Sequence, residues 1–225
     1  MLGVWDYTVI LTYISFASAG IGIFCAMSMR VQWAIFCLAC SGLCDMFDGK
    51  VARTKKDRTE DEKKFGIQID SLCDIVCFGI LPMTICYKSG MNRLFSVAVL
   101  VLYGLAGLVR LAHFNVMEEK RQQETSEDKK YYQGLPITSM AIALPLLFVL
   151  SPLLPGPKVF LIAMHVLVMV VGALFIVDFK LRKPTVMEII LITGVVALAV
   201  VILIFIGRSW WVFIRHAKFP PSLFR

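Results

Sequence analysis

Seven apolar stretches, each near the length of a membrane-spanning helix, dominate this chain of 225 residues. They occupy residues 8–29, 31–53, 66–88, 93–116, 136–154, 158–178 and 186–207. About 20 apolar residues in an α-helix cross the bilayer core, where the backbone must satisfy its own hydrogen bonds. Only 17% of the residues are charged, against about 25% in soluble domains. The sequence therefore predicts an all-α, polytopic membrane helix bundle, and we interpret the first stretch as a spanning helix, not a signal peptide.

Charged residues are concentrated in three connections between the apolar stretches. These are residues 50–64, 118–130 and 180–183, which hold most of the 23 Lys and Arg residues. If the chain enters from the cytoplasm, all three lie on one side, as the positive-inside rule requires. We expect a multi-pass protein of the cell membrane whose net charge of +7 faces anionic lipid, not nucleic acid. Seven spans place the basic tail on the opposite face, so either the tail is exported or one segment does not span.

Four aspartates follow helical spacing in two neighbouring stretches. The motifs are Asp45-x-x-Asp48-Gly49-x-x-Ala52-Arg53 and Gly66-x-x-x-Asp70-x-x-x-Asp74. At 100° per residue each set lies on one face of its helix. Two antiparallel helices joined by a loop bring these faces together, so we expect four carboxylates around one small volume near the cytoplasmic membrane surface. A carboxylate at the edge of hydrocarbon is costly unless it binds a cation or takes part in chemistry.

The acidic cluster predicts a site for divalent cations and phosphate. Close carboxylates repel one another, and a divalent cation removes that repulsion. Ligands that are all oxygen favour Mg²⁺ or Mn²⁺ over zinc. Gly49, Ala52 and Gly66 leave the helix faces bare for a phosphate chain, and Arg53 supplies a planar cation to hold it. In the alternative interpretation, the aspartates pair with Lys and Arg of the loop and cap the helices.

These motifs resemble the signature of the CDP-alcohol phosphatidyltransferase family, D-x-x-D-G-x-x-A-R followed by a spacer and G-x-x-x-D-x-x-x-D. Every fixed residue is present, but the spacer, residues 54–65, is about one helical turn longer than is usual in the family. The resemblance implies a six-helix core, here followed by one extra C-terminal span. It also implies two divalent cations, Mg²⁺ or Mn²⁺, held by Asp45, Asp48, Asp70 and Asp74. By the same resemblance Asp74 is the general base, Gly49 and Arg53 contact the CDP moiety, and Thr59 is a further contact.

Local features resemble the branch of the family that uses serine as acceptor. Residues 65–74 contain the Asp-Ser-Leu-x-Asp of that branch, and residues 109–116 and 134–136 resemble two of its other segments. The resemblance implies a transferase of phospholipid biosynthesis that moves the phosphatidyl group of CDP-diacylglycerol to the hydroxyl of L-serine, giving phosphatidylserine and CMP. Arg110 needs an anionic partner in its apolar helix. Substrate phosphate or the serine carboxylate would serve, and a lasting ion pair with one of the four aspartates is the alternative. We expect Asn115 to close the pocket or to cap the helix.

Two other functions compete with serine transfer. The same chemistry with glycerol 3-phosphate or inositol phosphate requires a more basic pocket than Arg110 alone offers. A divalent-cation transporter would carry polar residues across the whole bilayer, whereas here they gather at one end of two helices. We divide the chain into a catalytic membrane domain, residues 1–180, and an additional C-terminal span with an interfacial tail, residues 181–225. The resemblance further implies a homodimer, and we interpret the seven cysteines as packing residues of the apolar stretches.

Overall fold

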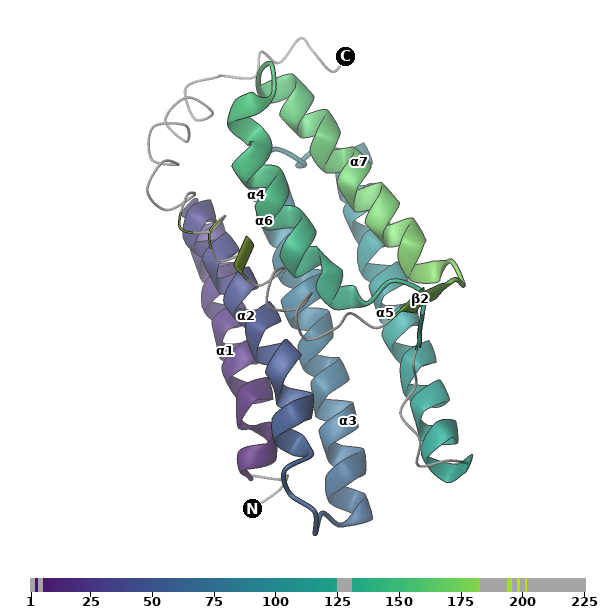
Figure 1. The fold of residues 1–225 in the computed structure, drawn as a ribbon. Helices are drawn as coiled ribbons and strands as arrows, with labels where there is room; N and C mark the ends of the chain where they lie inside the picture. The colour runs from purple at the N-terminus through teal and green to yellow at the C-terminus, as the bar shows by residue number, and fades with distance from the viewer. Residues whose placement is uncertain are drawn as a thin grey trace.

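The structure, a computed structural model, is a bundle of helices lying roughly side by side (Figure 1). It describes residues 3, 6–124, 131–182, 194–195, 198 and 201. The α-helices are α1 (Ile10–Met27), α2 (Val31–Ala52), α3 (Glu60–Asp74), α4 (Leu81–Lys88), α5 (Leu94–Glu124), α6 (Met140–Leu150) and α7 (Pro157–Ile176). Short 3-10 helices are η1 (Tyr7–Val9), η3 (Ile137–Ser139) and η4 (Ser151–Leu153), and η2 (Ile75–Ile80) is π-helical. The predicted all-α membrane bundle is confirmed.

The helical segments match the first six predicted apolar stretches. Four of them are long and apolar enough to cross a membrane: Tyr7–Met27, Glu60–Lys88, Leu94–Met117 and Pro157–Ile176. These segments leave large apolar side chains exposed, such as Phe24 and Leu102, as helices in contact with lipid do. The segment Ile137–Leu153 is apolar but shorter, and α2 carries acidic residues at its C-terminal end. The seventh stretch, 186–207, lies largely outside the described residues.

Helices α1 and α2 pack closely because small and hydroxyl side chains lie between them. A Cβ on Gly22 would come within 2.9 Å of the Cβ of Cys37, so only glycine allows this approach. Ser15 and Ser41 each donate a hydroxyl hydrogen bond to the other's backbone carbonyl, at 3.2 and 3.0 Å. Such small residues and interhelical hydrogen bonds hold helices together where the hydrophobic effect cannot. The pair therefore fixes the C-terminal half of α2 against the start of α1.

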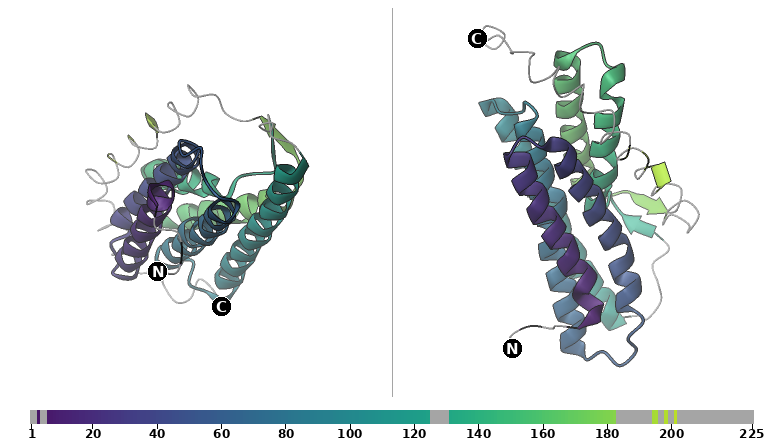
Figure 2. Two further views of the ribbon diagram at one scale, coloured as in Figure 1. Left: turned by 90° about the horizontal axis from the view of Figure 1, so that it is seen from below. Right: turned by 90° about the vertical axis from the view of Figure 1, so that its left-hand side faces the viewer.

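Helices α3, η2 and α4 form one continuous helical segment, in which Asp74 ends α3 and the π-helical turn follows directly. The Tyr103 hydroxyl of α5 donates a hydrogen bond to the carbonyl of Phe78 within that turn. Helix α3 contacts both α1 and α5 and lies between them in the view from below (Figure 2). π-Helical turns are frequent at functional sites. Here the turn starts immediately after one of the candidate site residues.

A short antiparallel ribbon accompanies the helices. Strands β1 (Tyr131–Gln133) and β2 (Lys180–Arg182) pair with Tyr131 opposite Arg182 and Gln133 opposite Lys180. The Gly134 amide extends the pairing by donating to the carbonyl of Phe179 at 2.6 Å. The ribbon ties the start of the α6–α7 hairpin to its end.

The α2–α3 connection and the end of α5 lie at the N-terminal end of the bundle (Figure 1), in agreement with the prediction that the first two charged connections share one side.

Candidate metal centre and adjoining cavity

Three of the four predicted aspartates converge at one point between α2 and α3. Oxygen atoms of Asp45, Asp70 and Asp74 all lie within 4.8 Å of one another. Asp74 is only 9% exposed. The helical spacing of the two motifs produces this convergence, because both faces turn toward the same gap between antiparallel helices. Three carboxylate oxygens at this separation fit one hard divalent cation, which takes oxygen ligands.

Asp48 lies beside this group of three, not within it. Its side chain is 9% exposed and accepts a hydrogen bond from the Thr12 hydroxyl at 3.5 Å. Its carboxyl is also a hydrogen-bonding neighbour of Asp70. The prediction of four carboxylates around one volume is therefore refined to a group of three, with Asp48 adjoining it through Asp70. Thr12 was not predicted, because a lone Thr in an apolar helix gives no signal until the fold places it opposite an acid.

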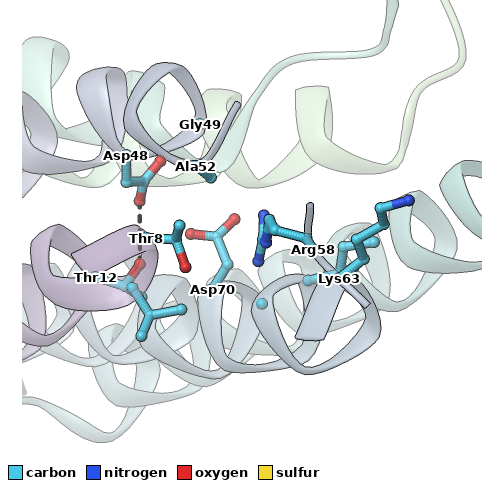
Figure 3. A pocket seen from close by; sticks show the side chains of 11 residues that line it. Thr8, Thr12, Asp48, Gly49, Ala52, Arg58, Lys63 and Asp70 are labelled. Carbon is cyan, nitrogen blue, oxygen red and sulfur yellow. Dashed lines mark hydrogen bonds between the residues drawn. The ribbon is translucent and has the colours of Figure 1, made fainter. Parts of the chain in front are cut away.

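A cavity of about 140 Å³ opens next to the acidic group (Figure 3). Its lining comes from η1 and α1 (Thr8, Val9, Thr12), from α2 (Asp48, Gly49, Ala52), from the connection (Arg58) and from α3 (Lys63, Gly66, Ile67, Asp70). A Cβ on Gly49 would meet no atom within 4 Å. The three small residues expected to leave the helix faces bare do line this cavity. Asp48 of α2 and Asp70 of α3 face into it from opposite helices (Figure 3).

The arginine that lines the cavity is Arg58, together with Lys63, whereas the sequence motif predicted Arg53. Arg53 is the C-terminal cap of α2, is exposed, and does not belong to the cavity lining. Thr59 caps α3: its hydroxyl accepts from the Glu62 amide at 3.2 Å, and the Glu62 carboxylate accepts from the Thr59 amide at 2.9 Å. This capping box starts α3 six residues before Gly66, and so the longer spacer is absorbed as helix. Neither Arg53 nor Thr59 lines the cavity.

The connection between α2 and α3 is tied to the N-terminus. The Lys55 ammonium lies 2.6 Å from the Asp6 carboxylate and 3.2 Å from that of Glu62. The hydrogen bond from Lys55 lowers the pKa of Asp6 below its ordinary value of 3.8. The same two carboxylates raise the pKa of Lys55. One Lys thus bridges the residue before η1 and the first turn of α3.

Arg110 and Asn115 of α5 lie outside the cavity lining. Arg110 is 8% exposed, and its guanidinium passes so close to Gly134 that a Cβ there would lie 3.3 Å from Nη1. Among the residues that the structure describes, the carboxylate that interacts with it electrostatically is Asp178, not one of the four site aspartates. Asn115 Oδ1 accepts a hydrogen bond from the Ser71 hydroxyl at 2.8 Å. Asn115 therefore ties α5 to α3 three residues before Asp74.

Comparison with known proteins places this arrangement in a family. The family model described as CDP-alcohol phosphatidyltransferase matches residues 7–178, which include both aspartate motifs and helices α1 to α7. The chain belongs to the CDP-alcohol phosphatidyltransferase family. The match ends at Asp178, close to the predicted domain boundary. The convergence of three aspartates favours a cation site over the alternative interpretation, in which the aspartates pair with Lys and Arg of the loop and cap the helices.

Relatives within the CDP-alcohol phosphatidyltransferase family carry names that mention serine. The chain is 39% identical to a CDP-diacylglycerol–serine O-phosphatidyltransferase of Saccharomyces cerevisiae over 106 residues, 46% of this chain and 37% of that protein. It is 34% identical to the Helicobacter pylori protein of the same name over 131 residues, 57% of this chain and 51% of that protein. It is 29% identical to an archaetidylserine synthase of Methanothermobacter thermautotrophicus over 136 residues, 60% of this chain and 54% of that protein. The chain thus spans about half, or less, of the length of these relatives.

Proposed function

We propose that this chain transfers the phosphatidyl group of CDP-diacylglycerol to the hydroxyl of L-serine. The serine oxygen forms a bond to the phosphorus that carries the diacylglycerol, and the bond from that phosphorus to CMP breaks. The products are phosphatidylserine and CMP. The observation that carries the proposal is the convergence of Asp45, Asp70 and Asp74 within 4.8 Å at the side of a cavity with bare helix faces. The serine acceptor is supported by the names of the relatives.

The four aspartates bind the cations, and one of them, Asp74, also takes part in proton transfer. Asp45, Asp70 and Asp74, with Asp48 beside them, would hold two divalent cations, Mg²⁺ or Mn²⁺, which when bound neutralise phosphate charge. Asp74 accepts the proton of the serine hydroxyl as that oxygen attacks, which is the role of a general base. The burial of Asp74 keeps bulk water from competing for that proton. The remaining work of the chain is to position the two substrates.

Other residues orient substrate around the cavity. Gly49, which leaves open space beside α2, lets the nucleotide approach the helix. Arg53 and Thr59 follow directly after two cavity-lining residues, Ala52 and Arg58. They provide contacts to the CDP moiety once it is bound. Arg110 lies at depth beside Gly134, where it attracts the serine carboxylate or a phosphate oxygen. Asn115 accepts the Ser71 hydrogen bond and so holds α5 against the part of α3 that ends in Asp74.

The placement in the cell follows from the fold and the charge distribution. The several apolar helices make this a multi-pass membrane protein. The basic residues of the charged connections support a cavity end that faces the cytoplasm at the cell membrane. Residues 1–180 form the catalytic membrane domain, and residues 181–225 add a C-terminal span with an interfacial tail. The active form is a homodimer. No nucleic acid takes part.

An acceptor screen tests the proposal. The purified full-length chain is given labelled CDP-diacylglycerol with Mg²⁺ or Mn²⁺ and, in separate reactions, L-serine, glycerol 3-phosphate or inositol phosphate. We expect CMP release and a labelled phosphatidylserine with serine alone, and loss of both when EDTA removes the cations. Preferential product formation with another acceptor would overturn the serine assignment. Cation transport into vesicles without CMP release would overturn the enzyme class.

A further inference from the structure

Arg58 occupies the cavity wall that the sequence pattern assigns to another cation. Its half-buried side chain lines the cavity, between Asp70 and Lys63 (Figure 3). One guanidinium nitrogen, Nη2, donates to the backbone carbonyl of Glu62 at 3.0 Å. The Nε atom is buried and, within the described part of the chain, has no hydrogen-bond partner. A buried donor without a partner costs free energy comparable to a lost hydrogen bond, so this N–H is expected to serve a bound ligand.

Gly66 creates the space in which Arg58 lies. A Cβ on Gly66 would come within 2.7 Å of Arg58 Nη2, a distance that requires the guanidinium to move. The second aspartate motif begins with this glycine. Its bare face is therefore covered by the Arg58 guanidinium instead of standing open. The small residue and the cation form one unit of the cavity wall.

The backbone is anchored on both sides of Arg58, and the hydrogen bond from Nη2 to the Glu62 carbonyl holds its side chain. Lys55 bridges Asp6 and Glu62 on one side, and on the other the Thr59 capping box begins α3. Lys63, the second cation of the lining, is exposed and pairs with Glu60 at 2.8 Å. Arg58 is thus the more enclosed and better positioned of the two. A held guanidinium binds with less loss of rotamer freedom than a mobile one.

We propose that Arg58 binds a phosphate oxygen of the diphosphate in the CDP-linked donor. The inference rests on the proposed function, since it assigns a residue to the nucleotide side of the same cavity. A planar guanidinium suits phosphate oxygens because its N–H groups form a fork that two oxygens can accept from. The diphosphate carries two negative charges, and Arg58 supplies a cation at the cavity wall beside Gly66. Arg58 becomes a binding and specificity residue that the extended connection contributes.

Nucleotide binding tests this assignment separately from turnover. Binding of labelled CDP to the full-length chain in Mg²⁺ is measured for the wild type, Arg58→Gln, Arg58→Lys and the control Lys56→Gln. Lys56 is exposed, belongs to the same connection and is absent from the cavity lining. We expect Arg58→Gln to weaken CDP binding about 10- to 100-fold, the size of a hydrogen bond to a charged group. Arg58→Lys restores part of the loss, and Lys56→Gln stays within about twofold.

A double-mutant cycle with Gly66→Ala tests the proposed unit of glycine and cation. Gly66→Ala displaces the guanidinium, so it should weaken CDP binding in the wild-type background and add little in the Arg58→Gln background. Steady-state kinetics should show a raised KM for CDP-diacylglycerol and an unchanged KM for serine in Arg58→Gln. A raised KM for only one of the two substrates would not follow from a general loss of structure. Additive effects of the two substitutions would contradict the contact between them.

The failures of the two proposals are distinguishable. A wild-type chain that neither binds CDP nor releases CMP from CDP-diacylglycerol overturns the proposed function, and the role of Arg58 with it. A wild-type chain that binds and turns over normally, while Arg58→Gln binds CDP as tightly as Lys56→Gln, overturns the role of Arg58 alone. If Arg58→Gln loses its thermal transition in detergent, the comparison passes to Arg58→Lys and Gly66→Ala. Unchanged CDP binding in both of these also overturns it.

Discussion

Asp74 is placed where proton transfer and cation binding coincide. It ends α3, is 9% exposed, and shares its oxygen cluster with Asp45 and Asp70. The next six residues are π-helical, so the carboxylate is held at a change of helical register. A residue in such a position can be tested by a substitution that preserves shape and removes only the charge.

We expect Asp74→Asn to lower CMP release by about 100-fold or more, because an amide cannot accept the serine proton as a carboxylate does. CDP binding should persist, since Asp45, Asp48 and Asp70 remain. Release of labelled CMP from CDP-diacylglycerol with serine measures the effect. The matched control is Asp61→Asn, an exposed position in the first turn of α3. Near-normal CMP release by Asp74→Asn would show that another group takes the proton.

The members of the site could be predicted from the sequence where helical spacing determines which residues share a face. The spacing of the first motif places Asp45 on one face of its helix, and the spacing of the second places Asp70 and Asp74 on one face of the next. The structure confirms that these two faces meet. Arg58 could not be found in this way, because the path of a connection depends on caps and ion pairs, not on a periodic pattern. The bridge from Lys55 to Asp6 and the capping box at Thr59 decide which Arg reaches the cavity.

At the scale of the element, the N-terminus of α3 is set by local hydrogen bonds. Thr59→Ala should destabilise the first turn of α3 by about 1 kcal/mol, because the hydroxyl is lost as an acceptor for the Glu62 amide. Thr59→Ser keeps that acceptor and serves as the control. Hydrogen–deuterium exchange of the peptide that spans residues 60–66 measures the change. Equal exchange in the two variants would show that the cap is dispensable.

The ion pair of Asp6 and Lys55 predicts a pH dependence. The pKa of Asp6 is lowered in the folded chain, so its contribution to stability is present above the ordinary pKa and is lost as pH falls through the lowered value. Asp6→Asn should therefore lower the melting temperature slightly at neutral pH and have no effect once Asp6 is protonated. Melting temperatures of the wild type and variant, taken from neutral to acidic pH in low salt, check this. Asp57→Asn, exposed in the same connection, provides the control, and a pH-independent difference would contradict the ion-pair account.

The β1–β2 ribbon could not be predicted from periodicity. Each strand has three residues, and the partners lie on either side of the whole α6–α7 hairpin. Pairing at that distance in sequence is decided by the packing of α5 against α7. By contrast, helices of about 20 apolar residues follow directly from the rule that a backbone in lipid must bond to itself.

In the molecule as a whole, the close packing of α1 against α2 determines how the site residues of these two helices are placed. Gly22→Ala should lower the free energy of unfolding by about 1–3 kcal/mol, because the added methyl group would lie 2.9 Å from the Cβ of Cys37. Gly20→Ala is the matched control in the same helix, since a Cβ there meets nothing within 4 Å. Thermal unfolding in detergent measures both. Equal stability of the two variants would show that this contact adjusts freely.

The π-helical turn at residues 75–80 also affects which way side chains face before and after it in the third span. A wider turn accommodates an additional residue relative to a regular helix, and so it offsets the phase of everything that follows. Upstream of the turn Asp70 and Asp74 point at α2, and downstream Leu81 and Ile85 are fully enclosed by neighbouring helices. Removing one residue there would rotate the two halves by about 100° with respect to each other. The two aspartates before the turn and the two apolar residues after it could then no longer all face the inside of the bundle.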